Sequence, residues 1–167
     1  VSVDCGVRLD GWCADGASTF VVGTATPVND QLVAATQELL NEAIAQIRPG
    51  VRWSTIASGL DRHAAEAGFG VIAEYVGHGI GRQLHEPPQA PAVMTRSLEG
   101  RGDFTLQPGM VIAVEPMLVV LDAETAERAR TTGRAERVNT VIDQDGWTVR
   151  TQSGAMACHC EHTIAVT

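Results

Sequence analysis

The sequence predicts a single α+β domain, built on an antiparallel sheet with helices packed on one side. Two segments with the apolar period of a helix follow each other directly, and strand-like segments stand before and after this pair. A block of helices between two groups of strands is typical of α+β proteins rather than of a doubly wound sheet. The length of 167 residues is enough for one domain with its own core.

Composition and charge limit the partners that this protein can have. The net charge of −8 argues against nucleic acid and anionic membranes as main partners. No apolar run approaches the roughly 18 to 20 residues that a membrane span needs, and no signal peptide is visible. The four cysteines lack the spacing of a zinc site, and because no secretion signal is visible we expect reduced thiols. We therefore expect a cytoplasmic protein, and we expect it to be a monomer.

The first strands are predicted from alternation around a turn. Over Val1–Leu9, apolar residues alternate with polar residues or glycine, which is the pattern of a half-buried strand. Asp10-Gly11 is a typical hairpin turn, and Trp12–Val22 is expected to return as the second strand. Because the strand pattern begins at Val1 without an initiator methionine, we expect that an N-terminal part of the fold is missing from this sequence.

Two helices are predicted next. Asn29 or Asp30 can cap a helix over residues 29–47, in which leucine, isoleucine and alanine recur on one face. Ser54 can cap a second helix over residues 54–67, which a glycine ends. The two helices together supply enough apolar surface to cover one side of a sheet.

The C-terminal half is predicted to return to strands, with one exception. Residues 122–137 are rich in alanine, arginine, glutamate and threonine without an apolar stripe, so we expect an exposed insertion that is partly helical or disordered. The other expected elements are a strand over residues 70–76, an irregular segment over 87–104, a strand over 110–121, a hairpin of 138–142 with 147–151, and a last strand over 155–167.

A glycine-rich stretch between Val76 and Pro88 contains two histidines. His78 stands among three glycines, and His85 follows seven residues later. Glycine permits positive φ and a close approach of the backbone, so a histidine in such a turn can reach a metal or a substrate. Taken alone, a loop histidine is equally well explained by simple exposure to solvent, and the rest of the chain must decide.

Four carboxylates stand in strand segments where burial is costly. Asp4 and Asp15 lie on the two sides of the first hairpin, and Glu115 and Glu161 interrupt apolar segments. Buried unpaired carboxylates are expensive and raise each other's pKa. Taken singly, Asp4 and Asp15 can be solvated, and Glu115 can pair with an arginine. Together with His78, the four negative charges match two divalent cations, and such donors suit Mn, Fe, Co or Zn.

These residues, in this order, resemble the metal ligands of the type I methionine aminopeptidases, which have the pita-bread fold. The resemblance covers nearly the whole chain, and it implies one metallopeptidase catalytic domain over residues 1–167 whose N-terminal part is absent. The matching motifs are Val-Asp-Cys-Gly-Val at 3–7, Gly-His-Gly-Ile-Gly at 77–81, Glu-Pro-Met at 115–117 and Glu-His-Thr at 161–163.

The resemblance also implies roles for the site residues. Glu115 would move a proton to and from the attacking water, and His85 would contact the substrate and steady the tetrahedral intermediate. Trp147 would form part of the methionine pocket. The activity implied is removal of the N-terminal methionine from nascent polypeptides, with two divalent ions (Co, Mn, Fe or Zn). The metal ligands implied are Asp4, Asp15, His78, Glu115 and Glu161, of which Asp15 and Glu161 would bridge the ions.

Departures from the family pattern leave two alternatives open. The usual His-Gly-Asp-Thr-Ser is Cys-Ala-Asp-Gly-Ala at residues 13–17, and Leu84 replaces an aromatic residue before His85. One alternative is a prolidase or X-Pro aminopeptidase of the same fold, which Pro87-Pro88 favours and the Glu-Pro-Met and Glu-His-Thr motifs oppose. The other is a catalytically inactive pita-bread module that binds peptides or proteins.

Overall fold

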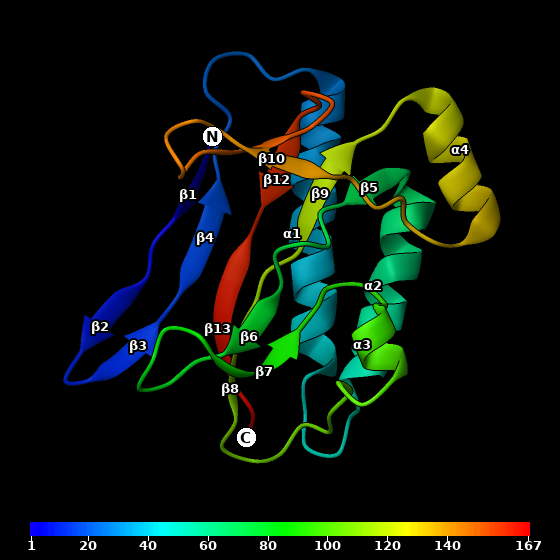
Figure 1. The fold of residues 1–167 in the computed structure, drawn as a ribbon. Helices are drawn as coiled ribbons and strands as arrows, with labels where there is room; N and C mark the ends of the chain where they lie inside the picture. The colour runs from blue at the N-terminus through cyan, green and yellow to red at the C-terminus, as the bar shows by residue number, and fades with distance from the viewer.

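The centre of the protein is a six-stranded antiparallel sheet, seen in a computed structural model that describes residues 1–167. The strand order is β1-β4-β13-β8-β6-β7, so strands from both ends of the sequence meet in the middle. Figure 1 shows α1 and α2 side by side along one side of this sheet. The predicted α+β class is confirmed. The strands are β1 (Ser2–Asp4), β4 (Gly16–Thr19), β6 (Gly77–Gly79), β7 (Glu86–Ala90), β8 (Val111–Val114) and β13 (Glu161–Ala165).

Helix α1 (Pro27–Gln46) begins earlier than predicted. Its N-cap is Thr26, whose hydroxyl accepts a hydrogen bond from the backbone N–H of Asn29 at 3.4 Å. The predicted caps, Asn29 and Asp30, are wrong because they lie inside the first turn. Threonine followed by proline is a suitable start for a helix, since the proline nitrogen has no hydrogen to leave unpaired.

Helix α2 (Trp53–Ala67) ends at Gly68 with a φ of 80°, as predicted, but it begins differently. Ser54 is not the N-cap, because that position falls on Arg52, which makes no capping bond with its side chain. Asp103 takes over this function from a distant loop. Its carboxylate accepts hydrogen bonds from the backbone N–H of Ser54 at 3.0 Å and from the Ser54 hydroxyl at 2.7 Å.

The core lies between the two helices and the sheet. Trp53 is fully buried, donates a hydrogen bond to the carbonyl of Pro91 at 2.9 Å, and stacks on Phe104. Apolar side chains from α1, α2 and β8 form one continuous cluster with it. This burial is the main favourable term that holds the helices against the sheet. The most deeply buried members include Leu39, Leu40, Ile56, Leu60 and Ile112.

A second sheet of three strands, in the order β12-β9-β5, continues two of the strands of the first. The segments 110–121 and 155–167, each predicted as one strand, are each broken into two. Pro116 interrupts the first because it has no N–H to donate to a ladder, and Cys160 interrupts the second. The bounds are β5 (Phe69–Val71), β9 (Met117–Val120) and β12 (Ala157–His159).

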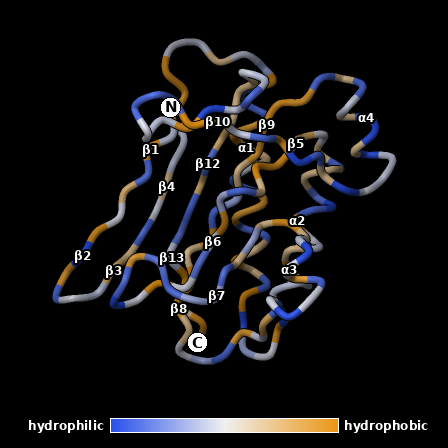
Figure 2. The backbone as a smooth tube through the Cα atoms, in the orientation of Figure 1, coloured by the Kyte–Doolittle hydropathy of each residue, from blue (hydrophilic) through white to orange (hydrophobic).

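The two predicted hairpins are present. In the first, Asp10 and Gly11 form the turn with φ values of 50° and 79°, as expected of a tight hairpin. The prediction that its apolar face is half-buried is wrong, because Leu9 is 76% exposed and the hairpin projects from the body (Figures 1 and 2). The strands are β2 (Val7–Leu9) and β3 (Trp12–Ala14), then β10 (Thr140–Ile142) and β11 (Val149–Thr151).

The segment 87–104, predicted as irregular, contains regular structure. Strand β7 includes Pro87 and Pro88, and a short helix, α3 (Arg96–Glu99), follows it. Strand β7 lies at the edge of the six-stranded sheet, where a proline costs no ladder hydrogen bond on its outer side. The prolines therefore mark an edge strand here rather than a loop.

Residues 122–137 form helix α4 (Ala123–Thr132) and an ordered return to the sheet. Ala126 and Ala129 are buried where α4 packs against α2. Arg137 then pairs with the buried carboxylate of Asp61 at 2.7 Å. The helical part of the prediction is confirmed, and the assignment of this segment as an insertion stays a prediction. None of the helices combines the length and the apolar character that crossing a membrane requires.

Candidate metal centre

Strand register brings three of the predicted ligands to one face of the six-stranded sheet. Asp4 pairs with Ala17, and Ala17 pairs in turn with Glu161. His78 pairs with Ala113 on the neighbouring strands. Directly paired residues point to the same face, so the small side chains of Ala17 and Ala113 lie among the polar ones and leave space between them.

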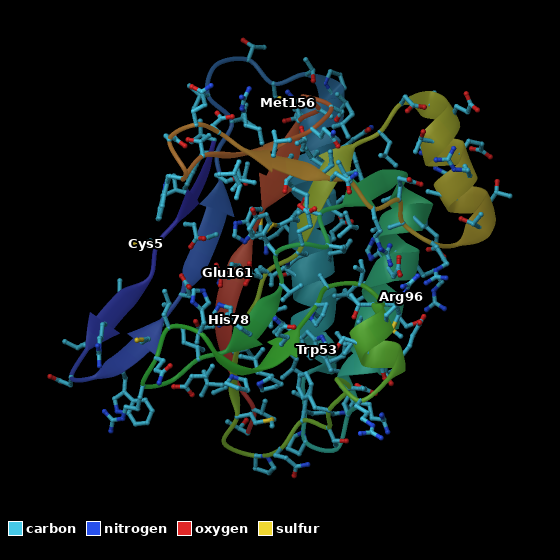
Figure 3. The ribbon with its side chains drawn as sticks, in the orientation of Figure 1. Cys5, Trp53, His78, Arg96, Met156 and Glu161 are labelled. Atoms are coloured by element: carbon cyan, nitrogen blue, oxygen red, sulfur yellow. The ribbon has the colours of Figure 1, made fainter.

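Alternation along the strands adds the other two ligands to this face. Asp15 stands two residues before Ala17, and Glu115 stands two residues after Ala113, and side chains repeat their direction every second residue. Glu115 Oε1 lies 3.7 Å from His78 Nε2. Figure 3 shows Glu161 on β13 and His78 on β6 close together. The five residues predicted from the sequence are therefore gathered in one place.

The site lies where the chain passes from one sheet to the other. Strands β8 and β13 pair in the six-stranded sheet, and their continuations β9 and β12 pair in the three-stranded sheet. The two interruptions meet at the crossing, since the N–H of Cys160 donates to the carbonyl of Pro116 at 3.5 Å. Glu115 and Glu161 stand at these interruptions, which turn both side chains into the same space.

His78 is oriented by its own neighbourhood. Its Nδ1 lies 2.8 Å from the carbonyl oxygen of Gly79. A carbonyl can only accept, so in the neutral ring Nδ1 carries the hydrogen and Nε2 keeps a free lone pair. This is the arrangement of a metal-binding histidine, whose other nitrogen is fixed by a backbone carbonyl. The free Nε2 faces Glu115.

Asp15 is fixed through its backbone by a threonine of the next strand. The N–H of Asp15 donates to the Thr163 hydroxyl at 2.8 Å, and that hydroxyl donates to the carbonyl of Asp15 at 2.8 Å. One carboxylate oxygen also accepts from the N–H of Gly16 at 3.0 Å. We name the two hydrogen bonds between Thr163 and the backbone of Asp15 the Thr163 clamp. It holds the aspartate in place although its strand is interrupted there.

The electrostatics of the site are unfavourable in the absence of a cation. The side chain of Glu161 is only 2% exposed, and its Oε1 has no hydrogen-bond partner. Burial, and then the charges of Glu115, Asp15 and Asp4, raise the pKa of Glu161 to about 9. Burial and the nearby charge of Asp4 likewise raise the pKa of Asp15. A buried acceptor without a donor is costly, and a metal ion would satisfy it.

The donor atoms fit such an ion. One donor atom from each of Asp15, His78 and Glu161 lies within 4.8 Å of the others. Carboxylates with an imidazole form a donor set typical of Mn, Fe, Co and Zn. Divalent charge would also reverse the effect of crowding on the pKa values, because it favours the ionised carboxylates. The residues present therefore fit a divalent metal.

A cavity of about 470 Å³ opens over the site. His85 lines it, with its ring 4.4 Å from the ring of His78 between centroids. Its apolar wall includes Ile72, Val76 and Met117. The cavity thus combines polar groups at one end with apolar surface, as small-ligand sites usually do.

One predicted residue is not brought to the cavity. Trp147 lies in the turn between β10 and β11 and is 86% exposed. Val149, two residues later, reaches the cavity wall instead. The assignment of Trp147 to a substrate pocket stays a prediction.

One residue of the site was missed. His159 lines the cavity, and its Nε2 lies 3.6 Å from Glu115 Oε2. The signal was present in the sequence, because His159 and Glu161 are two residues apart in a strand-like segment and so share a face. Cys158 and Cys160, on either side of His159, are both buried as free thiols.

Comparison with known proteins identifies the family. The family model described as "Metallopeptidase family M24" matches residues 1–167. The chain belongs to metallopeptidase family M24. Among curated members, it is 38% identical over 167 residues to the methionine aminopeptidase of Aquifex aeolicus and 41% identical over 173 residues to methionine aminopeptidase 1 of Mycobacterium tuberculosis. Both alignments cover 100% of this chain and 58% of the relative.

Solved structures of M24 proteins confirm the fold. The methionine aminopeptidase of Thermotoga maritima superposes with a TM-score of 0.83 at 37% identity, over 99% of this chain and 59% of that chain. An Xaa-Pro dipeptidase from Bacillus anthracis gives a TM-score of 0.69 at 22% identity, over 99% of this chain and 36% of that chain. The second likeness concerns the fold alone. The predicted pita-bread fold and the resemblance to methionine aminopeptidases are confirmed.

Proposed function

We propose that this M24 protein is a metal-dependent aminopeptidase that releases the N-terminal methionine from polypeptides. The observation that carries the proposal is Glu161, a buried carboxylate with an unpartnered oxygen among three other carboxylates and a histidine. Such a cluster is too costly to serve stability alone. It is well suited to holding cations.

The ions are assigned to the five residues that share one face of the sheet. Their four carboxylates carry the charge of two divalent ions, so we propose two ions, chosen from Co, Mn, Fe or Zn. When bound, they supply the Lewis acidity that makes water a nucleophile near neutral pH and offset the negative charge that develops during attack. The proposed ligands are Asp4, Asp15, His78, Glu115 and Glu161.

Two residues of the chain are proposed to act on the substrate. Glu115 faces the cavity with 11% of its side chain exposed, so its carboxylate can take a proton from water and pass it to the leaving amine. His85 lines the same cavity beside His78. Its imidazole can donate a hydrogen bond to the carbonyl oxygen of the peptide bond and hold that bond at the site.

The substrate is proposed from the relatives and from the cavity wall. The two curated relatives described above are named as methionine aminopeptidases. Ile72, Val76 and Met117 form apolar surface suited to an unbranched thioether side chain. The prolidase alternative has support from the fold alone, since the dipeptidase relative is only 22% identical. The inactive-module alternative is opposed by the presence of all five proposed ligands on one face of the sheet.

The setting of the reaction is also a proposal. All four cysteines are free thiols, which supports the cytoplasm as the compartment. We propose nascent polypeptides as substrates and a monomer as the working form.

The test measures methionine released from a Met-Ala-Ser peptide by the purified chain with added Mn or Co. We expect release by the wild type and a loss of about 100- to 1,000-fold in Glu161→Gln, because losing a metal ligand weakens the stabilisation of the negative charge that develops during attack. Glu99→Gln, an exposed substitution away from the site, should keep full activity. Preference for an Ala-Pro peptide would favour the prolidase alternative, and metal binding without hydrolysis of either peptide would favour the inactive module.

A further inference from the structure

His159 ends strand β12, at the crossing between the two sheets. It pairs with Met117 of β9, and both residues line the cavity. Its side chain is 13% exposed, and its Nε2 is buried without a hydrogen-bond partner. Of all buried side-chain nitrogen and oxygen atoms in the protein, the two without a partner are His159 Nε2 and Glu161 Oε1. Both stand at this site.

Two carboxylates lie within reach of an ion bound to His159 Nε2. It lies 3.6 Å from Glu115 Oε2 and 4.0 Å from Glu161 Oε2. These separations are too long for hydrogen bonds. Metal–nitrogen and metal–oxygen bonds are about 2.0 to 2.2 Å long, so two ligands of one ion can stand up to about 4.2 Å apart. The pair His78 Nε2 and Glu115 Oε1, at 3.7 Å, falls in the same range.

The backbone of His159 is held by a threonine, just as that of Asp15 is. The N–H of His159 donates to the Thr19 hydroxyl at 3.0 Å, and that hydroxyl donates to the carbonyl of His159 at 2.8 Å. This Thr19 clamp repeats the Thr163 clamp on the opposite strand. The fold therefore positions His159 by the same device that positions an expected metal ligand.

We propose that His159 is a metal ligand, a second imidazole that binds the ion on the Glu115 and Glu161 side of the site. This inference rests on the proposed metal-dependent function. A neutral imidazole adds a donor without adding charge, so the four carboxylates still balance two divalent ions. Nitrogen donors also move the preference of the site toward Zn, Co and Fe and away from Mg and Ca.

The experiment compares metal binding by the wild type, His159→Gln and His159→Ala. Zinc affinity is measured by calorimetry, and X-ray absorption at the zinc edge counts bound imidazoles through scattering from the ring atoms. The metal-free circular dichroism spectrum and melting curve show that each variant is folded. His63→Gln is the matched control, because His63 lies on α2 and contacts Glu42 instead of the site.

We expect His159→Gln to bind zinc at least about tenfold more weakly, since loss of even an outer-shell partner costs about 10- to 100-fold. The imidazole count should fall by one, and added free imidazole should restore affinity in His159→Ala. Unchanged affinity and imidazole count in both variants would overturn the role of His159 while leaving the proposed function intact. Failure of the wild type to bind any divalent ion would overturn both proposals.

Discussion

The two faces of the six-stranded sheet carry different kinds of side chain. On the face toward the helices, Ile112 and Val114 of β8 are buried in the apolar cluster with Leu39. On the other face, Ala113 of the same strand pairs with Thr163 on one side and with His78 on the other, and Glu115 follows two residues later. Neighbouring residues of one strand therefore contribute either to stability or to the site. We call the face toward the helices the helix face and the other face the open face. The helix face stabilises the fold by burying apolar side chains, whereas the open face brings together like charges, which cost stability unless a cation binds there.

The most damaging change expected lies on the helix face. Leu39→Ala removes a side chain that is 1% exposed, so the free energy of unfolding should fall by about 2–5 kcal/mol. Urea unfolding measures it, with Leu9→Ala as the control, since Leu9 is 76% exposed and should change stability by no more than about 0.5 kcal/mol. Equal losses in both variants would mean that burial against the helices does not determine the stability of the protein.

A divalent metal bound at the open face should raise the stability of the whole protein, and this gain should not depend on the packing of the helix face. At a free Mn or Zn concentration about 100-fold above the dissociation constant, the gain expected from mass action is about 2.7 kcal/mol for each ion bound. The melting temperature with metal and with excess chelator measures it. Leu39→Ala should keep this gain, and Glu161→Gln should lose most of it. An identical melting curve with and without chelator would contradict a built metal site.

The metal-free protein should lose stability as the pH rises. The pKa of Glu161 is raised from 4.5 to about 9 by burial and by the charges of Glu115, Asp15 and Asp4, so the folded state holds this proton more tightly than the unfolded state does. The stabilisation is full below about pH 4.5 and is lost as the pH approaches about 9. Because glutamine does not titrate, Glu161→Gln should lose less stability across this window, by on the order of 1–3 kcal/mol.

Urea unfolding in chelator, at about pH 5.5 and about pH 8.5, brackets that window. Parallel stability profiles for the wild type and Glu161→Gln would show that Glu161 is not held protonated in the metal-free protein. Glu99→Gln, whose carboxylate is exposed, serves as the control and should follow the wild type.

The smallest change in stability is expected when the hydrogen bonds that position Asp15 on the open face are removed. Thr163→Val keeps the shape of the side chain but removes both hydrogen bonds of the Thr163 clamp on Asp15, and should cost about 1–2 kcal/mol of stability and weaken metal binding. Thr131→Val, on the exposed side of α4, should change stability by no more than about 0.5 kcal/mol. Metal affinity equal to wild type in Thr163→Val would show that the clamp does not position the ligand.

The open face was easier to predict from the sequence than the body that supports it. Carboxylates such as Glu115 and Glu161 interrupt apolar segments, and such positions are conspicuous because burial of charge is costly. His159 was missed because it lies between Cys158 and Cys160, and this segment was considered only for the spacing of a cysteine-based zinc site. The alternation of side chains along a strand thus assigns polar residues to a face as well as apolar ones, provided that it is applied to every residue of the strand.

The errors in the fold have a common physical origin. Alternation shows that Leu9 and its neighbours form one face of a strand, but it does not show what covers that face, and here it is exposed. Pro87 and Pro88 mark an edge strand as readily as a loop. The first helix is capped by Thr26 and the second by the distant Asp103. Each case depends on tertiary neighbours that a local pattern does not contain.

The pairing of β4 with β1 on one side and β13 on the other has a consequence for biosynthesis. Asp4 and Glu161 stand near opposite ends of the chain, yet both flank Ala17. During synthesis the first four proposed ligands are made before the fifth, and pairing between segments so distant in the sequence forms slowly. The complete set of proposed ligands therefore requires β13, so we expect the protein to bind its metal only after synthesis has passed Glu161 and this strand has paired.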